Sequence, residues 1–528
     1  MVSMLDKKFL KGLSTVLALA LSVLNSAAAS TPEEPLVYRA DVVVVGAGSA
    51  GLSAALEAAN HHARVIILEK MPMIGGNSLQ AAGYMLALPP ETDPQRLAQA
   101  REELIRDMLK EGGSGANKEK ITMIVDQSRN AVKWLQGMGA ELKSSPDYVT
   151  TDYPVAYHPL AGTFTVGEEL VKTLVHSVET HNIPMLTLTH VTSFTTDDEG
   201  QLTGVVAVKG DGRELQVRAP AVIVATGGFG ASDQMVEKYV HLPYNMSSTN
   251  LPGTTGDGLV LSEKLGAKLV DMDQVMVHLT TLPFSGLVIP MQARTAGGIL
   301  INEKGHRFAN ELSADLDPYY KRADGHAWLI MDQDIVDRFP VLRNYAVSGF
   351  MQKGRTEEEL ARLIRVNPET LSQEMERYRA FARRQQDADY HRPTMPSLLN
   401  HYPLYAISVR PGLQSTLGGL ATDTTTRVLD KNDKPIAGLY AVGEVTGGLF
   451  GARRLEGSSL TASVVFGRIA GRNAAEYARR QKGLPASGAS KKVSQSPVAE
   501  STIDPLSATH TPSAGKSAAA ATSAHTTP

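Results

Sequence analysis

The sequence contains no cysteine among its 528 residues. This absence excludes disulfide bonds, thiolate metal sites and cysteine-linked prosthetic groups, so any redox centre must be held by other residues. Charge of one sign is also lacking, because 52 Lys and Arg stand against 55 Asp and Glu. Because the two kinds of charge nearly balance, the composition does not indicate a basic surface that binds nucleic acid. The hydrophobic fraction of 42% and charged fraction of 20% are typical of a globular chain, and the length predicts several domain-sized units.

The apolar run at the amino terminus is short and covers residues 13–24. It is well below the roughly 20 apolar residues that a membrane-spanning helix needs, which disfavours the alternative of a stable membrane anchor. Three lysines precede this run and three alanines at 27–29 follow it, so residues 1–29 are predicted to be a secretory signal peptide. No twin arginine precedes the apolar run, which favours general (Sec-type) export to the periplasm. Residues 483–528 are dominated by Ala, Ser, Thr and Pro and are predicted to be a disordered low-complexity tail.

The body of the chain alternates strand-like and helical patterns. Buried strands are predicted at residues 41–45, 64–68, 221–225 and 438–443, with short strands from 183 to 224. Helices are predicted at residues 54–60, 94–112, 118–137 and 462–479. A strand, helix and strand in this order predict a parallel α/β sheet. Residues 272–400 have mixed helices and loops and are predicted to form an inserted second domain.

The most specific local motif is Gly-Ala-Gly-Ser-Ala-Gly at residues 46–51, between the first strand and its helix. Glycines at these positions permit a tight turn and let the backbone approach a pyrophosphate at the helix N-terminus. Glu69 ends the second strand 23 residues after Gly46, where an acid binds a ribose hydroxyl. Strand, glycine turn, helix and acid together predict a dinucleotide site.

Four further segments decide which dinucleotide is meant. They are GGNS at 75–78, TTGDG at 254–258, GGILINEKGHRFANE at 297–311 and AVGEVTGGLFGARRLEGSSL at 441–460. This set resembles the flavoprotein subunits of the fumarate reductase and flavocytochrome c family, which is related to the ketosteroid dehydrogenases. The resemblance extends over residues 42–474.

The resemblance implies an α/β fold with a Rossmann-like FAD-binding domain and an inserted α+β capping domain. The implied limits are residues 38–271 and 401–482 for the FAD-binding domain and 272–400 for the capping domain. Members with covalent FAD carry a histidine where this sequence has Ser78, so the FAD is expected to be non-covalent. The implied cofactor-binding residues are Gly46, Gly48, Ser49, Ala50, Gly51, Glu69, Lys70, Gly75, Gly76, Asn77, Ser78, Ala82, Gly83, Ala225, Thr226, Gly227, Asp257, Gly443, Glu444, Arg454, Ser459 and Leu460.

The resemblance also implies catalytic positions, and the match is partial. His278 falls on the family's substrate-binding histidine, Arg294 on an arginine of its proton relay, and Arg454 on its carboxylate clamp. Asp315 stands where the family has its proton-donor arginine, and Gln414 where it has a second clamp histidine. A relay glutamate is also replaced, by the methionine at position 291.

These departures favour a substrate with one carboxylate over a dicarboxylate, because one arginine and a neutral amide balance one negative charge. The expected reaction is hydride transfer from flavin to the activated C=C bond of a small enoate. Without a haem attachment motif, electrons are expected from a separate cytochrome or quinol-linked donor. Asp315 donates a proton only if burial raises its pKa, and it is equally well explained as a helix N-cap. Tyr319 and Tyr320 are alternative donors, and Arg454 has Glu456 and Glu444 as alternative ion-pair partners.

Two other functions stay open at this stage. One is the reverse reaction, dehydrogenation of a saturated ketone or acid with Asp315 as the base. The other is a flavin-holding electron carrier without catalysis. The sequence does not identify the substrate, the donor or the oligomeric state.

Overall fold

A computed structural model describes residues 36–145, 155–160, 165–241, 246–283, 285–313, 315–323 and 325–484. The predicted signal peptide lies outside these residues, as does all but the first two residues of the predicted tail. Within the described part of the chain, no helix combines the length and the apolar character needed to cross a membrane.

A six-stranded sheet forms the centre of the cofactor half, in the order β20-β21-β11-β2-β3-β7. Its strands from β21 to β7 run parallel, and β20 is antiparallel. Every residue of β2, β3 and β11 is buried, as expected for parallel strands covered on both faces. The bounds are β2 (Val42–Val45), β3 (Val65–Leu68), β7 (Met185–Leu186), β11 (Ala221–Val224), β20 (Arg427–Leu429) and β21 (Pro435–Ala441).

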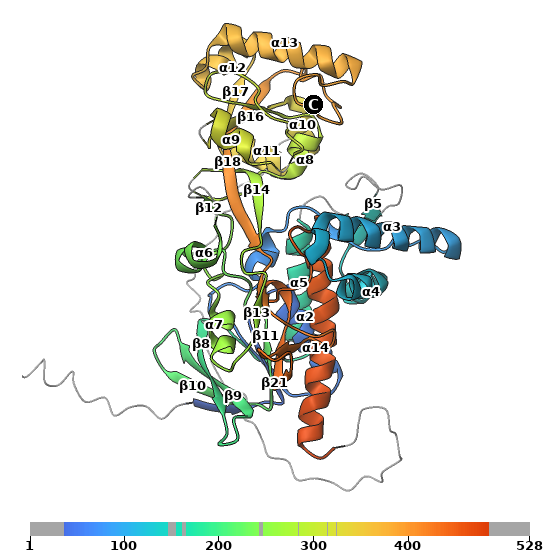
Figure 1. Cartoon of the computed structure of the whole chain (residues 1–528), viewed down its shortest axis with the longest axis vertical. Helices are drawn as coiled ribbons and strands as arrows, with labels where there is room; N and C mark the ends of the chain where they lie inside the picture. Colours follow the sequence, from blue (N-terminus) through green and yellow to red (C-terminus); the bar gives the residue numbers. More distant parts are fainter. Residues whose placement is uncertain are drawn as a thin grey trace, which may run out of the picture. The chain divides into compact units, whose positions relative to one another are not determined.

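Helices cover one face of this sheet and a second sheet covers the other (Figure 1). The helical layer contains α2 (Ser49–Asn60), α3 (Pro94–Gly112), α4 (Lys118–Gly137), α5 (Val166–Thr180) and α14 (Ser458–Gln481). The second sheet has the order β1-β10-β9-β8, with β1 (Leu36–Arg39), β8 (Thr189–Thr196), β9 (Leu202–Lys209) and β10 (Glu214–Arg218). The predicted bounds of α3 and α4 are confirmed. Both helices begin where they do because the side chains of Asp93 and Asn117 cap their first turns.

A third sheet is built around the long strand β18 (Leu404–Thr416), which the sequence patterns did not predict. It pairs antiparallel with β14, β16 and β17 and parallel with β12, and β15 pairs with β16. These partners are β12 (Ser247–Ser248), β14 (Val275–Thr281), β15 (Ile299–Ile301), β16 (Ala327–Asp332) and β17 (Met351–Gly354). A separate hydrophobic core joins residues between 279 and 409, so the sheet extends past residue 400.

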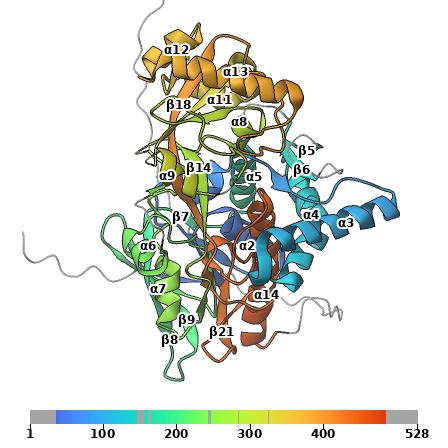
Figure 2. The same cartoon turned by 45° about the horizontal axis from the view of Figure 1, so that its top comes forward.

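Helices α8 to α13 belong to this second core, and α12 and α13 lie with β18 in Figure 2. Their bounds are α8 (Met291–Thr295), α9 (Asp317–Ala323), α10 (Gln333–Arg338), α11 (Pro340–Val347), α12 (Glu357–Leu363) and α13 (Pro368–Arg384). The antiparallel pairing with flanking helices confirms an α+β insertion in an α/β fold. The remaining elements are β4 (Met85–Leu86), β5 (Leu142–Ser145), β6 (Ala156–Pro159), α6 (Asp233–Tyr239), α7 (Asp257–Glu263), β13 (Leu269–Val270) and β19 (Gly419–Leu420).

The contact between α2 and α14 is unusually close because glycines face the partner helix. A Cβ atom built at Gly471 would lie 2.2 Å from the carbonyl oxygen of Ala54, and one built at Gly467 would lie 2.6 Å from that of Ala50. Interiors packed this tightly do not accept even one added methyl group without movement. The α2–α14 contact therefore fixes the helix that follows the glycine turn.

We expect Gly471→Ala to destabilise the FAD-loaded protein by about 1–3 kcal/mol, because the new methyl group forces the helices apart. Thermal unfolding followed by flavin release measures this effect. Gly137→Ala is the matched control, since a Cβ there meets no atom within 4 Å. That control is expected to leave the midpoint unchanged or raise it. Equal midpoints for both variants would contradict the close-packing argument.

Candidate active site

The ends of the parallel strands surround a cavity of about 410 Å³. Its volume lies in the range of roughly 300–1,000 Å³ that small-molecule sites occupy. Most of the predicted cofactor residues line it: Gly46, Gly48, Ser49, Ala50, Glu69, Lys70, Gly76, Asn77, Ser78, Ala225, Thr226, Gly227, Asp257, Gly443, Glu444, Arg454, Ser459 and Leu460. Residues far apart in the sequence thus meet at one edge of the sheet, where ligands of open α/β sheets bind.

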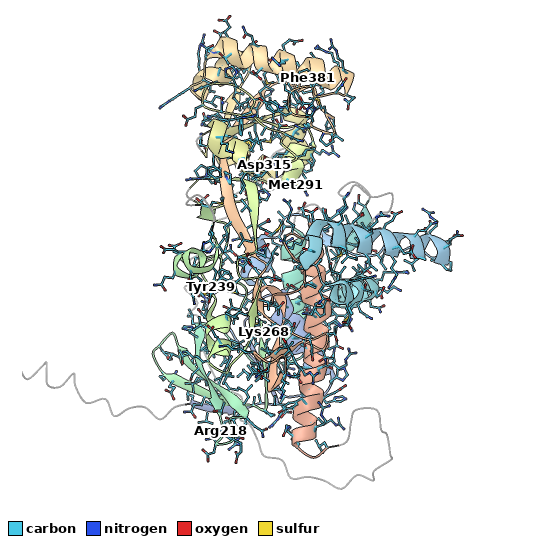
Figure 3. The ribbon with its side chains drawn as sticks, in the orientation of Figure 1. Arg218, Tyr239, Lys268, Met291, Asp315 and Phe381 are labelled. Carbon is cyan, nitrogen blue, oxygen red and sulfur yellow. The ribbon has the colours of Figure 1, made fainter. Side chains whose placement is uncertain are left out.

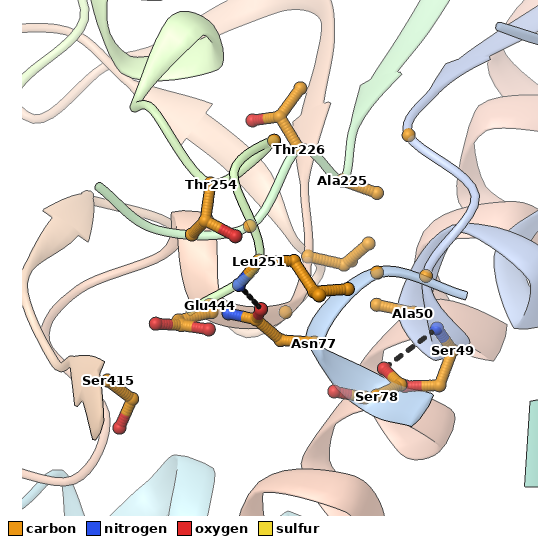
Figure 4. Close-up of a pocket in the computed structure, with 18 of the residues that line it drawn as sticks. Ser49, Ala50, Asn77, Ser78, Ala225, Thr226, Leu251, Thr254, Ser415 and Glu444 are labelled. Carbon is orange, nitrogen blue, oxygen red and sulfur yellow. Dashed lines mark hydrogen bonds between the residues drawn. The ribbon is translucent and has the colours of Figure 1, made fainter. Parts of the chain in front are cut away.

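The glycine turn brings the backbone of β2 against β11 and opens the N-terminus of α2. Gly46 has φ of 106°, and a Cβ there would lie 2.4 Å from the carbonyl oxygen of Ala225. A Cβ at Gly51 would lie 2.0 Å from the carbonyl oxygen of Gly46. Gly48 provides no side-chain cap for α2, while the Ser49 backbone N–H donates to Ser78 Oγ over 3.2 Å (Figure 4). The free N-terminal amides of α2 are therefore available for a phosphate group.

Glu69 is buried and holds the turn from the end of β3. Its Oε2 accepts a hydrogen bond from the Ala47 backbone N–H at 2.9 Å, and its Oε1 accepts one from Met71 at 2.8 Å. A carboxylate has about four acceptor positions, so both oxygens keep a lone pair for a ribose hydroxyl. This geometry suits the role predicted for Glu69.

A cluster of ionisable side chains, Lys70, Asp257 and His190, lines the cavity together with Glu69. Lys70 Nζ donates to Thr255 Oγ1 at 2.5 Å and to Asp257 Oδ2 at 2.6 Å. His190 Nε2 lies 3.2 Å from the same Asp257 oxygen. Although burial opposes ionisation, hydrogen bonds from Lys70 and Thr255 hold the pKa of Asp257 below its usual value. His190 was not predicted because it belongs to no local motif, and Thr255 was not predicted although it lies in the TTGDG segment at 254–258.

A second polar network lies further along the cavity. The Leu251 backbone N–H donates to Asn77 Oδ1 at 2.9 Å (Figure 4). The Asn77 side chain also hydrogen-bonds Glu444. The Thr416 backbone N–H donates to Glu444 Oε1 at 3.0 Å. Burial raises the pKa of Glu444 despite these bonds. A buried carboxyl of this kind can bind a polyol chain, which is the role implied for Glu444.

The cavity wall also contains two buried hydroxyls, Thr226 Oγ1 and Ser415 Oγ, that have no hydrogen-bond partner within the described residues. Buried polar atoms without partners are rare in native proteins. Their position against the cavity is what a bound polar cofactor would explain. The residues present therefore fit a flavin dinucleotide.

Four predicted cofactor residues are not part of the cavity lining: Gly51, Gly75, Ala82 and Gly83. Their contacts explain the difference in three cases. Gly51 packs against the glycine turn, a Cβ at Gly75 would meet Leu79 at 2.6 Å, and a Cβ at Gly83 would meet Glu456 Oε1 at 2.5 Å. These glycines shape the walls of the site without facing the cavity.

Two of the five predicted catalytic residues, Arg454 and Gln414, line the cavity. Arg454 is half-buried, and burial lowers its pKa while Glu444 and Glu456 oppose that shift. Gln414 lies in β18, where its carbonyl oxygen accepts a hydrogen bond from Asn250 Nδ2 at 3.2 Å. The side chain of Gln414 is not needed for this contact. Both residues are thus positioned to meet a molecule in the cavity.

His278 and Arg294 lie close together in the second core. Burial and the charge of Arg294 lower the pKa of His278 to about 3, so its imidazole is neutral at pH 7. Arg294 is 4% exposed, and its Nη1 donates to the Glu311 carbonyl oxygen at 2.5 Å. The backbone of Arg294 is held in turn by Arg392 Nη2, which donates to its carbonyl oxygen at 2.5 Å. The structure therefore places His278 close to Arg294, although neither residue is part of the cavity lining.

Asp315 is not part of this cluster. It is exposed just before α9, where its Oδ1 accepts a hydrogen bond from the Asp317 backbone N–H at 3.0 Å (Figure 3). This is the contact expected of a residue that caps the first turn of a helix. The helix-capping interpretation of Asp315 fits the structure better than the catalytic one.

Sequence reasoning mentioned Glu456 only as a partner for Arg454, and it did not place Tyr84 in the site. Burial raises the pKa of Glu456, opposed by Arg454 and Arg294. Tyr84 is 5% exposed and interacts electrostatically with Glu456 and Arg454. The available signal in the sequence was the position of Glu456 two residues after Arg454. A carboxyl group so close to a cation that is predicted to bind substrate could have been considered as part of the site.

Comparison with known proteins defines the class. The model of the FAD binding domain family matches residues 41–460, so the chain belongs to this family. The protein is an FAD-dependent oxidoreductase. This class favours an enzyme over the non-catalytic electron carrier.

Particular relatives are reductases. A fumarate reductase (cytochrome) from Shewanella frigidimarina is 33% identical over 481 residues, covering 90% of this chain and 80% of the relative. A urocanate reductase from Eggerthella lenta is 29% identical over 482 residues, covering 85% of this chain and 77% of the relative. The protein is thus related to flavoenzymes that reduce C=C bonds.

Solved structures agree with this relationship. The open conformation of a flavocytochrome c3 fumarate reductase superposes with a TM-score of 0.73 at 32% identity, covering 87% of this chain and 81% of that one. A 3-ketosteroid-Δ4-(5α)-dehydrogenase from Rhodococcus jostii superposes with a TM-score of 0.62 at 27% identity, covering 85% and 99%. The predicted family and its link to ketosteroid dehydrogenases are confirmed.

We expect Glu69→Gln to weaken FAD binding by about 10–100-fold, because a charge-assisted hydrogen bond contributes about 1.5–3 kcal/mol. Fluorescence titration of the apoprotein with FAD measures the dissociation constant. Glu199→Gln, at an exposed turn between β8 and β9, is the matched control. An unchanged dissociation constant in Glu69→Gln would remove the ribose assignment.

Proposed function

We propose that the protein reduces the activated C=C bond of a small monocarboxylate enoate. Bound FAD supplies the hydride, and the chain's own side chains bind the substrate, exclude water and deliver a proton. The observation that carries this proposal is the half-buried guanidinium of Arg454 in the wall of the FAD cavity. Burial lowers the pKa of Arg454, so an anionic ligand would compensate for a poorly solvated charge.

Two of the other predicted substrate-binding residues, Gln414 and His278, support a single carboxylate. Gln414 is uncharged, and His278 is neutral because its pKa is lowered to about 3. A second carboxylate would find a neutral imidazole and an amide in place of cations, and burying an unpaired charge is costly. These neutral groups suit a carbonyl or another polar group of the substrate. A related protein from Vibrio harveyi is named NADH:acrylate oxidoreductase, and acrylate is a monocarboxylate enoate.

We further propose that electrons come from a separate cytochrome or quinol-linked donor and that the enzyme works in the periplasm. Both proposals rest on the sequence, since the chain has no cysteine for haem attachment and begins with the predicted signal peptide. N-terminal sequencing of the mature protein from a periplasmic fraction tests the export proposal. A mature chain beginning near residue 30 supports it, and an intact cytoplasmic chain contradicts it.

The proposed reaction is tested by anaerobic reoxidation of the reduced flavin with a panel of acrylate, urocanate, fumarate and an unsaturated ketosteroid. Faster reoxidation by a monocarboxylate than by fumarate supports the proposal. The reverse activity, with a saturated substrate and an artificial electron acceptor, would instead favour the dehydrogenase that the ketosteroid relative suggests. Preference for fumarate would overturn the single-carboxylate argument.

We expect Arg454→Ala to lower kcat/KM for the best enoate by at least about 100-fold, because a bidentate hydrogen-bonded charge pair is lost. Stopped-flow reoxidation of the reduced flavin measures it. Arg453→Ala is the matched control, since Arg453 is exposed and its Nε donates to Glu111 Oε1 at 2.8 Å. Similar losses in both variants would show that the segment is only structural.

A further inference from the structure

Four buried side-chain atoms without hydrogen-bond partners in the described residues belong to one group of neighbours. They are Gln292 Oε1, Arg294 Nε, Tyr319 Oη and Glu456 Oε2. Arg294 interacts electrostatically with Tyr319 and Glu456, and the Gln292 side chain hydrogen-bonds Glu456. An isolated polar atom of this kind costs about 1–3 kcal/mol, so a group of four indicates a place built to handle a polar ligand or a proton.

The carboxyl of Glu456 is positioned by a hydrogen bond from Gln292 and by close packing against Gly83. Its Oε1 occupies the space that a side chain at position 83 would fill, because a Cβ built at Gly83 would lie 2.5 Å from that oxygen. Glu456 follows Arg454, which lines the cavity, by two residues. The charged and titratable groups that act on it are Arg454 in its own segment, Arg294 in α8 and Tyr84 before β4.

This environment makes Glu456 a suitable acid. Burial raises its pKa, so the carboxyl holds its proton to higher pH than an exposed glutamate. Once the proton leaves, Arg454 and Arg294 stabilise the carboxylate. A general acid works best when its pKa lies near the working pH. Burial has the larger effect on Glu456, so its pKa is raised towards that range although the two arginines oppose the shift.

The other titratable groups considered as donors are less suitable than Glu456. His278 is already deprotonated at neutral pH, and burial raises the pKa of Tyr319 above the range of a useful acid. Asp315 is exposed and accepts a backbone hydrogen bond. The carboxyl of Glu444 is held by Asn77 and Thr416.

We propose that Glu456 supplies the proton that completes reduction of the C=C bond, an inference that rests on the proposed enoate reductase function. The hydride, with its electron pair, forms one new C–H bond. The π electron pair of the alkene takes the Glu456 proton and forms the second C–H bond on the other carbon. The O–H bond of the carboxyl breaks, its electron pair stays on the carboxylate, and FAD is left oxidised. Solvent then returns a proton to Glu456.

The test compares Glu456→Gln with the parent enzyme. We expect the rate of flavin reoxidation by the enoate to fall about 10²–10⁴-fold, the usual contribution of a general acid. Binding of the saturated carboxylate product, measured from the difference spectrum of oxidised FAD, is expected to change less than about 3-fold, because the clamp arginine is intact. In the parent, the rate should fall as pH rises through the pKa of Glu456, since the protonated form donates. That limb should be absent in Glu456→Gln and shifted in Glu456→Asp.

A second variant moves the carboxyl without removing it. Gly83→Ala places a methyl group against Glu456 Oε1 and should also slow reoxidation while FAD binding is retained. Glu199→Gln, at the exposed turn between β8 and β9, is the control and should react at the parent rate. Full activity of Glu456→Gln, or a loss of product binding equal to the loss of rate, would overturn the proposal.

A readout without turnover separates this inference from the proposed function. A pH titration of the oxidised FAD spectrum should show one protonation step above the ordinary glutamate range, and Glu456→Gln should lack that step. If no enoate reacts but the step is present, the reductase proposal fails alone. If enoates react and the parent shows no such step, the assignment of Glu456 fails alone.

Discussion

The parallel register of the central sheet is the constraint on which the rest of the site depends. Residues 42–45 pair in register with 65–68 on one side and 221–224 on the other, so these strands end at one edge. The glycine turn, Glu69 and the Ala225 segment therefore meet although the chain between them is long. Each of these contacts is made by backbone or by a side chain next to a strand end. The cofactor half is consequently rigid, because shifting one strand would displace all of them.

Most of the cofactor half could be predicted from the sequence because its determinants are local. Positive φ at Gly46 and the close approach at Gly51 require glycine whatever surrounds them. The limits of α3 and α4 follow from capping residues directly before each helix. The same reasoning missed β18, whose 13 residues include Pro411 and Gly412 and lack strict alternation. Its long pairing is decided by β14, β16 and β17, which lie elsewhere in the sequence.

The substrate half was less predictable because its chemistry depends on long-range neighbours. Asp315 was expected near the reaction on the basis of a matched position, and the fold exposes it at the start of α9. Glu456 was mentioned only as an ion-pair partner, yet the fold places it with Arg294 and Tyr84, which come from distant segments. No spacing rule relates these three residues. Burial, which decides whether a carboxyl keeps its proton, is a property of the assembled structure.

The two halves therefore differ in how far their residues can change. The FAD-facing turn depends on backbone geometry, where glycine has no substitute, whereas the substrate-facing groups interact through charge. A carboxyl group on any nearby element can interact with the charge of Arg294. Arg294 therefore keeps an acidic neighbour although position 291 is a methionine, because Glu456, in the segment around Arg454, interacts with it. Such exchange keeps the local charge balanced while altering which ligand the site accepts. Chemistry in this fold can diverge through the inserted domain and the segment around Arg454 while the sheet edge that binds FAD stays fixed.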